Sequence, residues 1–203
     1  MEIKLVGVVG AGQMGNGIAH VFALAGYNVV MTDISEDSLS RALGTIEKNI
    51  ERQVSRGKVM PADKRAAMER ISTTLKLADL GQCDLIIEAA TERETVKQAI
   101  FEDLLPHLKP TTILTSNTSS ISITRLASRT DRPEKFMGFH FMNPVPVMQL
   151  VELIRGIATD EPTWTALHEV VRKLGKTAAS AEDFPAFIVN RILMPMINEA
   201  VYT

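Results

Sequence analysis

Short apolar runs alternate along the chain with longer stretches in which apolar residues recur every three or four positions. The short runs are typical of buried strands, and the longer stretches are typical of amphipathic helices. The predicted strands cover residues 3–9, 28–32, 84–88, 112–115, 136–141 and 147–154. The predicted helices cover residues 14–25, 36–57, 94–108 and 162–174, with a shorter one after residue 61. Repeated strand–helix units predict an α/β fold with a mostly parallel sheet and helices on both faces.

A glycine-rich turn, Gly-Ala-Gly-Gln-Met-Gly at residues 10–15, separates the first strand from the first helix. We expect Gly10 to allow a tight turn, Gly12 to let the backbone approach a pyrophosphate, and Gly15 to let the helix pack closely on the strand. Free N–H groups around Gly12, Gln13 and Met14 would face the phosphates with the positive end of the helix dipole. The motif therefore predicts a dinucleotide-binding domain with a doubly wound sheet of the Rossmann type.

Asp33 follows the second predicted strand, where an acid determines which dinucleotide binds. Its carboxylate can accept hydrogen bonds from the adenosine ribose hydroxyls and would repel a 2′-phosphate. The expected cofactor is therefore NAD and not NADP. Ser35, two residues further on, is the expected N-cap of the next helix.

Composition and charge exclude several classes of partner. The 203 residues leave room for one large α/β domain and part of another, and 45% hydrophobic residues supply a full core. A net charge of −2 gives no reason to expect nucleic acid or a membrane surface as a partner. Cys83 is the single cysteine, and neither a signal peptide nor a membrane-spanning run is present. We expect a cytoplasmic protein without a metal site.

Polar residues that could carry chemistry gather after predicted strands. The turn Ser-Asn-Thr-Ser-Ser at residues 116–120 either caps a helix or lines a ligand site, and its spacing favours neither. Asn190 is expected one turn into an otherwise apolar helix, where a buried amide needs a hydrogen-bond partner.

His140 has two equally weighted interpretations. A histidine between aromatic and apolar residues is often a hydrogen-bonded core residue. The prolines at 144 and 146, however, constrain the following loop and favour a shaped site. Glu152 on a neighbouring strand could keep one imidazole nitrogen protonated and leave the other as a base.

Segments 10–15, 116–120, 140–152 and 187–191 together resemble the L-3-hydroxyacyl-CoA dehydrogenases, most closely the bacterial 3-hydroxybutyryl-CoA members. The resemblance covers essentially the whole chain and favours a functional His140. It implies that His140 and Glu152 form a catalytic dyad, and that Ser119 and Asn190 contact the reacting oxygen of the substrate.

The resemblance also implies the ligands. The residues expected at the nicotinamide ribose are Glu92, Lys97, Ser119 and Asn143. Without the resemblance, Glu92 and Lys97 would be interpreted as a solvated helix start. Asn49 and Arg56 are expected to touch the CoA portion of an acyl-CoA substrate, although the family commonly has lysine at the second position. The implied reaction is reversible NAD-dependent oxidation of a 3-hydroxyacyl-CoA to a 3-ketoacyl-CoA.

Two other functions are compatible with the glycine turn. An NAD-dependent dehydrogenase of a free hydroxy acid needs a cation for the substrate carboxylate, and the segments above offer only Arg191. A non-catalytic NAD-binding module has no need for the four residues implied at the reacting oxygen and the dyad.

The resemblance divides the chain in two. Residues 1–184 are expected to form the NAD-binding domain, and residues 185–203 to begin a helical domain that closes over the substrate and forms the homodimer. We expect an isolated cofactor domain or a shortened protein that binds NAD, turns over weakly or undetectably, and self-associates through its terminal helix.

Ala186 departs from the family pattern, which usually has glycine there. If the backbone φ is positive at this position, alanine costs about 1 kcal/mol or shifts the following helix. If the position needs only a small residue, little changes.

Overall fold

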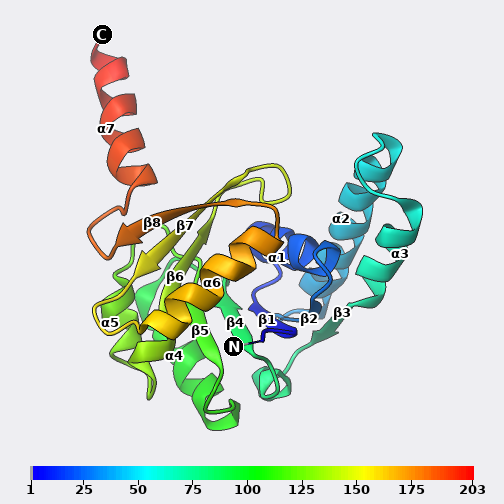
Figure 1. Cartoon of the computed structure of the whole chain (residues 1–203), viewed down its shortest axis with the longest axis horizontal. Helices are drawn as coiled ribbons and strands as arrows, with labels where there is room; N and C mark the ends of the chain where they lie inside the picture. The colour runs from blue at the N-terminus through cyan, green and yellow to red at the C-terminus, as the bar shows by residue number, and fades with distance from the viewer. Residues whose placement is uncertain (1) are drawn as a thin grey trace.

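An eight-stranded sheet forms the centre of the computed structural model, which describes residues 2–203 (Figure 1). The strands lie in the order β3-β2-β1-β4-β5-β6-β7-β8. Neighbouring strands are parallel, except that β7 runs antiparallel to β6. Their bounds are β1 (Leu5–Val9), β2 (Asn28–Thr32), β3 (Ile71–Thr74), β4 (Leu85–Glu88), β5 (Ile113–Ser116), β6 (Phe136–Phe141), β7 (Leu150–Arg155) and β8 (Thr177–Glu182).

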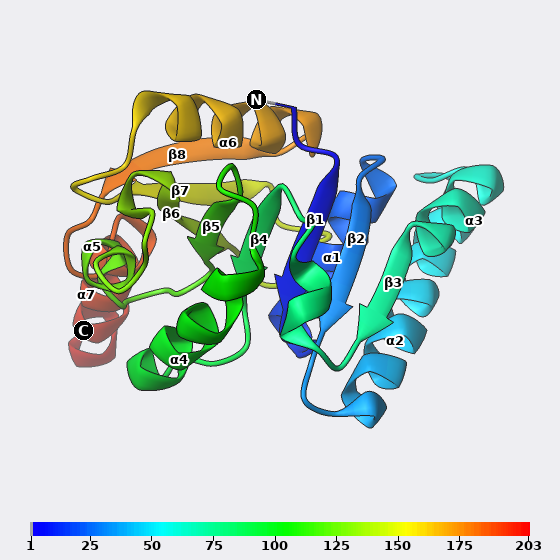
Figure 2. The same cartoon turned by 90° about the horizontal axis from the view of Figure 1, so that it is seen from below.

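Helices cover both faces of the sheet (Figure 2). Their bounds are α1 (Gln13–Leu24), α2 (Glu36–Ser55), α3 (Pro61–Glu69), α4 (Glu94–Leu104), α5 (Ile123–Ala127), α6 (Glu161–Lys173) and α7 (Val189–Tyr202). Residues of α1, α2, α3 and α6 join one buried apolar cluster, and residues of α4 and α5 join another. Along β4, Leu85 and Ile87 belong to the first cluster and Ile86 to the second, so the clusters lie on opposite faces.

The strand order confirms the predicted doubly wound class. The chain first builds β1, β2 and β3 in one direction, and then returns to the other side of β1 to build β4, β5 and β6. The order therefore reverses between β1 and β4. Ligands of such sheets bind outside the carboxyl ends of the strands at this reversal, so the ends of β1 and β4 mark the expected site.

The sequence pattern did not predict the two edge strands. β3 reads Ile-Ser-Thr-Thr and β8 reads Thr-Ala-Ala-Ser-Ala-Glu, and neither contains an apolar run. Each lies at one edge of the sheet and is only partly buried. Because hydrogen bonds to a single neighbour hold them in place, these strands need few apolar side chains.

Other predicted elements have shifted bounds. The strand expected at 147–154 is β7 at 150–155, because the N–H groups of Val147 and Met148 both donate to the carbonyl of Pro144 and form a turn. The helix expected to reach residue 108 ends at Leu104 and continues as a 3-10 turn. Ser35 caps α2 as predicted, since its Oγ accepts from the N–H of Ser38 at 3.3 Å.

His20 is buried where α1 packs against α2. Its Nε2 lies 3.3 Å from Gln53 Oε1, and its Nδ1 has no partner among the described residues. Burial lowers the pKa of His20 from 6.5 to about 4; the hydrogen bond with Gln53 opposes this shift, and the positive charge of Lys176 adds to it. The imidazole is therefore neutral in the folded chain at neutral pH.

This histidine should make folding sensitive to mild acid. Because its folded pKa is depressed, its contribution to stability is complete above pH 6.5 and is lost as pH falls towards 4. We expect His20 to lower the free energy of unfolding by about 2 kcal/mol between pH 7 and pH 5. Urea unfolding at several pH values measures this slope. His20→Met should flatten the slope, and His107→Gln, at an exposed position, should leave it unchanged.

Candidate active site

A cavity of about 550 Å³ opens at the carboxyl ends of β1, β4, β5 and β6. Its wall combines the glycine turn, the loop after β4, the turn after β5, the end of β6 and the first turns of α7. The residues predicted from sequence that line it are Gly12, Gln13, Met14, Glu92, Lys97, Ser119, His140, Asn143 and Asn190. Residues from distant parts of the chain thus meet at the expected edge of the sheet.

The three glycines of the turn have different surroundings. Gly10 has φ +102°, and a Cβ there would lie 2.6 Å from the Cα of Ala90. A Cβ on Gly15 would lie 1.7 Å from the carbonyl oxygen of Gly10. A Cβ on Gly12 would meet no atom within 4 Å. Gly10 and Gly15 are therefore required by the fold of the turn itself, whereas Gly12 leaves open space beside the cavity.

Asp33 lies beside the glycine turn at the end of β2. Its Oδ2 accepts from the N–H of Ala11 at 2.8 Å, and its Oδ1 accepts from the N–H of Ser35 at 3.1 Å. Asp33 lines a second cavity of about 380 Å³ together with the fully exposed Ile34. Each carboxylate oxygen retains acceptor capacity for a ligand hydroxyl there.

His140 and Glu152 are directly opposed on the antiparallel strands β6 and β7. His140 Nδ1 lies 2.6 Å from Glu152 Oε2, and Glu152 is fully buried. Burial raises the pKa of Glu152, but hydrogen bonds from His140 and from two backbone N–H groups outweigh it and hold the pKa below its usual range. The ionised carboxylate keeps Nδ1 protonated, so the lone pair of the neutral imidazole is on Nε2, and His140 lines the cavity.

The other oxygen of Glu152 fixes the start of α7. Oε1 accepts from the N–H groups of Ile188 at 2.9 Å and Val189 at 2.8 Å. The preceding residues Ala186 and Phe187 both adopt left-handed backbone conformations, with φ +69° and +51°. Because φ at Ala186 is positive, alanine at this position costs about 1 kcal/mol relative to glycine.

This backbone geometry corrects the predicted position of Asn190. The amide was expected one turn into a helix, but the left-handed pair delays the helix, and Asn190 is only the second residue of α7. Asn190 is partly buried, and its Nδ2 donates to the carbonyl oxygen of Ser119 at 2.9 Å. The amide has thus found the partner it needed, and this contact joins α7 to the turn after β5.

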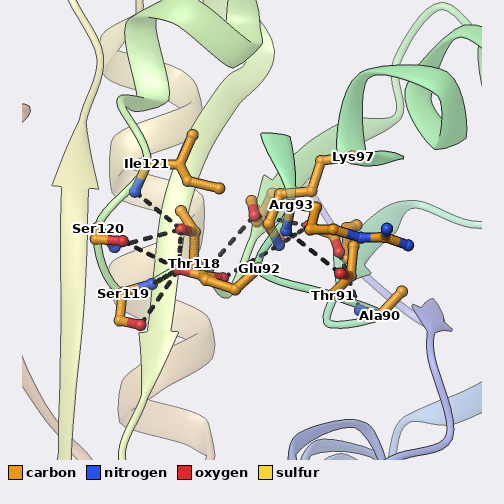
Figure 3. A network of polar contacts seen from close by, with 12 residues as sticks. Ala90, Thr91, Glu92, Arg93, Lys97, Thr118, Ser119, Ser120 and Ile121 are labelled. Atoms are coloured by element: carbon orange, nitrogen blue, oxygen red, sulfur yellow. Dashed lines mark hydrogen bonds and ion pairs between the residues drawn. The ribbon is translucent and has the colours of Figure 1, made fainter. Parts of the chain in front are cut away.

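Glu92 gathers the turn that carries Ser119 (Figure 3). Its Oε1 accepts from Thr118 Oγ1 at 2.6 Å, from the N–H of Ser119 at 2.9 Å and from Ser119 Oγ at 3.3 Å. Burial alone would raise the pKa of Glu92. These hydrogen bonds and the nearby ammonium of Lys97 have a larger combined effect in the opposite direction, so the pKa lies below its usual range. Glu92 is therefore a fixed negative charge at the cavity.

Lys97 is not the solvated helix residue that its sequence context indicates. Its side chain is 1% exposed, and its Nζ lies 2.5 Å from Glu88 Oε2 and 3.7 Å from Glu92 Oε2. Sequence reasoning gave Glu88 no role. The signal was present, because Glu88 is a charged residue at the end of the apolar strand Leu-Ile-Ile-Glu.

Asn117 and Asp183 also lacked a predicted role. Asn117 Oδ1 accepts from the N–H of Phe141 at 2.8 Å and so fixes the strand end beside His140. Asp183 accepts from the N–H groups of Ile123 at 2.9 Å and Thr124 at 2.8 Å, which ties the segment before α7 to the start of α5. Both contacts join residues more than 20 positions apart, and no local pattern reveals them.

Asn49 and Arg56 do not lie in the main cavity. They line a third one, of about 450 Å³, beside α2. Arg52 and Lys58 add positive charge to its wall, and the prolines at 144 and 146 form its other side. The loop at residues 142–149 therefore lies between this basic cavity and the cavity that contains His140.

The fold and the glycine turn define a dinucleotide-binding domain. Residues 5–184 match the family model described as 3-hydroxyacyl-CoA dehydrogenase, NAD binding domain. The chain is 63% identical over 201 residues to a 3-hydroxybutyryl-CoA dehydrogenase of Bradyrhizobium diazoefficiens, covering 99% of this chain and 69% of the relative. It is 45% identical to a probable 3-hydroxybutyryl-CoA dehydrogenase of Bacillus subtilis, covering 100% and 70%.

A solved structure agrees with these matches. The (S)-3-hydroxybutyryl-CoA dehydrogenase of Ralstonia eutropha superimposes with a TM-score of 0.95 at 46% identity, covering 98% of this chain and 70% of that one. The chain belongs to the 3-hydroxyacyl-CoA dehydrogenase family, as its sequence motifs indicated, and carries the family's NAD-binding domain. NAD is its cofactor, as predicted.

Residues 2–203 include neither a membrane-spanning helix nor a metal-binding cluster of side chains. No helix has the length and apolar character needed to cross a bilayer. No cluster of three or more His, Cys, Asp or Glu side chains is placed to hold a metal ion.

The open space at Gly12 gives a test of cofactor binding. Gly12→Ala should fold normally but weaken NADH binding roughly tenfold or more, because its methyl group meets no protein atom yet occupies the space a pyrophosphate would approach. Gly15→Ala is the matched control and should lose both stability and affinity, since its Cβ would clash with Gly10. Thermal unfolding and fluorescence titration separate the two effects. Wild-type affinity in Gly12→Ala would contradict the pyrophosphate position.

Proposed function

We propose that the chain catalyses the reversible NAD-dependent oxidation of a short-chain 3-hydroxyacyl-CoA, such as 3-hydroxybutyryl-CoA, to the 3-ketoacyl-CoA. The observation that carries the proposal is the buried pair of His140 and Glu152, joined at 2.6 Å, at the wall of a cavity that also includes the glycine turn. A base fixed by a carboxylate beside a hydride acceptor is the arrangement that alcohol oxidation requires.

His140 acts as the base in this mechanism. Its Nε2 takes the proton of the 3-hydroxyl group, and Glu152 stabilises the imidazolium that forms. NAD, when bound, accepts the hydride from the same carbon. Ser119 and Asn190, linked at 2.9 Å, would hold the substrate oxygen as its charge changes. In the reductive direction His140 returns the proton as the acid.

The cofactor-binding residues follow the cavity wall. Gly12, Gln13 and Met14 would face the pyrophosphate with the N-terminus of α1. Asp33 would accept the adenosine ribose hydroxyls in the adjacent cavity. Glu92, Lys97, Ser119 and Asn143 would surround the nicotinamide ribose, and all four line the main cavity.

The charge distribution favours an acyl-CoA over a free hydroxy acid. Among residues 2–203, Lys97 is the one cationic residue that lines the main cavity, and Glu88 already pairs with it. A free carboxylate therefore has no unpaired cation beside His140. The basic cavity of Asn49, Arg52, Arg56 and Lys58 instead offers positive charge for the phosphates of a CoA.

We further propose that residues 1–184 form the cofactor domain and that residues 185–203 belong to a helical unit that contributes to a homodimer. α7 projects away from the sheet (Figure 1), and none of its residues is buried. Ile192, Met196 and Ile197 are exposed on it, a face that favours self-association. The single cysteine is consistent with a reducing, cytoplasmic location.

The test is NADH oxidation with acetoacetyl-CoA and with free acetoacetate, measured in a full-length context, because these residues alone are expected to turn over weakly or undetectably. The proposal predicts consumption of NADH with the thioester and little or none with the free acid. A preference for the free acid would support the alternative dehydrogenase. NADH binding with no oxidation in either reaction would support a non-catalytic module.

Variants of His140 and Glu152 should lower turnover without changing cofactor binding. In a full-length context, we expect His140→Ala to lower kcat at least about a hundredfold with acetoacetyl-CoA, because it removes the acid and base of the reaction. Glu152→Gln should lose less, since the imidazole remains with a weaker partner. NADH affinity should stay within about twofold in His140→Ala. Near-wild-type kcat in that variant would refute the assignment of His140.

Asp33 should determine the choice between the two dinucleotides. The wild-type chain is expected to bind NADPH at least about tenfold more weakly than NADH, because the carboxylate repels the 2′-phosphate. Asp33→Asn keeps an acceptor for the N–H of Ala11 and removes the charge, so it should narrow this difference. Parallel fluorescence titrations measure both constants. Equal affinities in the wild type would exclude this role of Asp33.

A further inference from the structure

Glu88 is a buried acid to which the proposed mechanism assigns no step. It ends β4 directly after three apolar residues, and its side chain is fully buried. Burying a carboxylate is strongly unfavourable unless hydrogen bonds and an opposite charge compensate it. The partners of Glu88 therefore indicate why a charge lies there.

Three segments of the chain meet at Glu88. Its Oε2 accepts from Lys97 Nζ at 2.5 Å and from Ser116 Oγ at 2.7 Å. Its Oε1 accepts from the N–H of Ala90 at 2.9 Å, and its carbonyl oxygen accepts from the N–H of Asn117 at 2.8 Å. The carboxylate is thus held in one orientation and joins the loop after β4 to α4 and to the end of β5.

These contacts continue to the turn that carries Ser119. Ser116 Oγ accepts from the N–H of Thr118 at 3.3 Å, and Thr118 Oγ1 donates to Glu92 Oε1 at 2.6 Å. Glu92 Oε2 lies 3.7 Å from Lys97 Nζ, which closes a ring of polar groups. Figure 3 shows Thr118, Glu92 and Lys97 of this ring side by side. Two carboxylates therefore hold one ammonium group between them.

Lys97 lies between Glu88 and the cavity. Lys97 lines the cavity wall, whereas Glu88 does not. An ammonium group has three N–H donors. Glu88 engages one donor at hydrogen-bond distance, and Glu92 attracts a second at a longer distance. A donor thus remains for a ligand, and Glu88, which holds the ammonium group, does not itself line the cavity.

We propose that Glu88 is a positioning residue for the cofactor, which acts by fixing the ammonium of Lys97 at the nicotinamide ribose side of the cavity. This inference rests on the proposed contact of Lys97 with the cofactor. Glu88 itself touches neither cofactor nor substrate. If the ion pair of Glu88 and Lys97 were merely structural, its loss would change the free energy of unfolding and leave the affinity for NADH unchanged.

A double-variant cycle distinguishes the two roles. The four proteins are the wild-type chain, Glu88→Gln, Lys97→Met and the combined variant, each measured by NADH fluorescence titration and by urea unfolding. We expect Glu88→Gln and Lys97→Met each to raise the Kd for NADH roughly tenfold or more. The combined variant should have the Kd of Lys97→Met, because Glu88 acts through Lys97. Its stability should recover towards the wild type, because no unpaired charge stays buried.

Lys109→Met provides the matched control. Lys109 Nζ pairs with Asp84 Oδ1 at 2.6 Å just before β4, at the opposite end of the same strand. This variant should alter stability and leave the Kd for NADH within about twofold of the wild type.

Several results would overturn the proposal. An unchanged Kd in a destabilised Glu88→Gln variant would assign Glu88 to stability alone. A further loss of affinity on adding Glu88→Gln to Lys97→Met would show that Glu88 does not act through Lys97. The comparison of Lys97→Met with the combined variant can be made even if the single variant Glu88→Gln fails to fold, because it does not use that single variant. An unchanged Kd in Lys97→Met would instead refute the proposed cofactor contact, and this inference with it.

Discussion

The buried carboxylate of Glu152 organises the site, because its two oxygens bind two different parts of the chain. One oxygen of Glu152 holds His140, and the other holds the N–H groups that begin α7. β7 runs antiparallel to β6, whereas the other neighbouring strands are parallel, and this pairing sets His140 and Glu152 directly opposite each other. The orientation of the imidazole and the position of the helix that carries Asn190 therefore have one common cause. A disturbance of either is transmitted to the other through a single carboxylate.

Other acids at strand ends work in the same way. Asp33 holds the backbone of the glycine turn, Glu88 holds the loop after β4, and Asp183 holds the start of α5. Each takes up backbone N–H groups that would otherwise lack a partner where a strand gives way to a loop. The loops around the cavity are consequently fixed before any ligand arrives. Polar groups held in advance spend little free energy on reorganisation during a reaction.

The sequence predicted best what depends on neighbours along the chain. The glycine turn, the cap at Ser35 and the strand at residues 28–32 are local features, and their bounds agree with the structure. The edge strands β3 and β8 were missed because hydrogen bonds to a distant strand, and not an apolar pattern, hold them. The start of α7 was misplaced because two left-handed residues delay it. Glu88 and Asn117 stayed unassigned because their partners are brought together only by the sheet.

The direct opposition of His140 and Glu152 also constrains how the length of this region can vary. Side chains along a strand alternate between the faces of the sheet, so an extra residue within β7 ahead of Glu152 would turn its carboxylate to the far face. Extra residues in the connection at 142–149 would leave the pairing of the two strands intact. Within the strand, an insertion of two residues would keep the carboxylate on its original face, whereas an insertion of one residue would not. Residues 142–149 belong to neither strand, so their number does not set the face that Glu152 occupies.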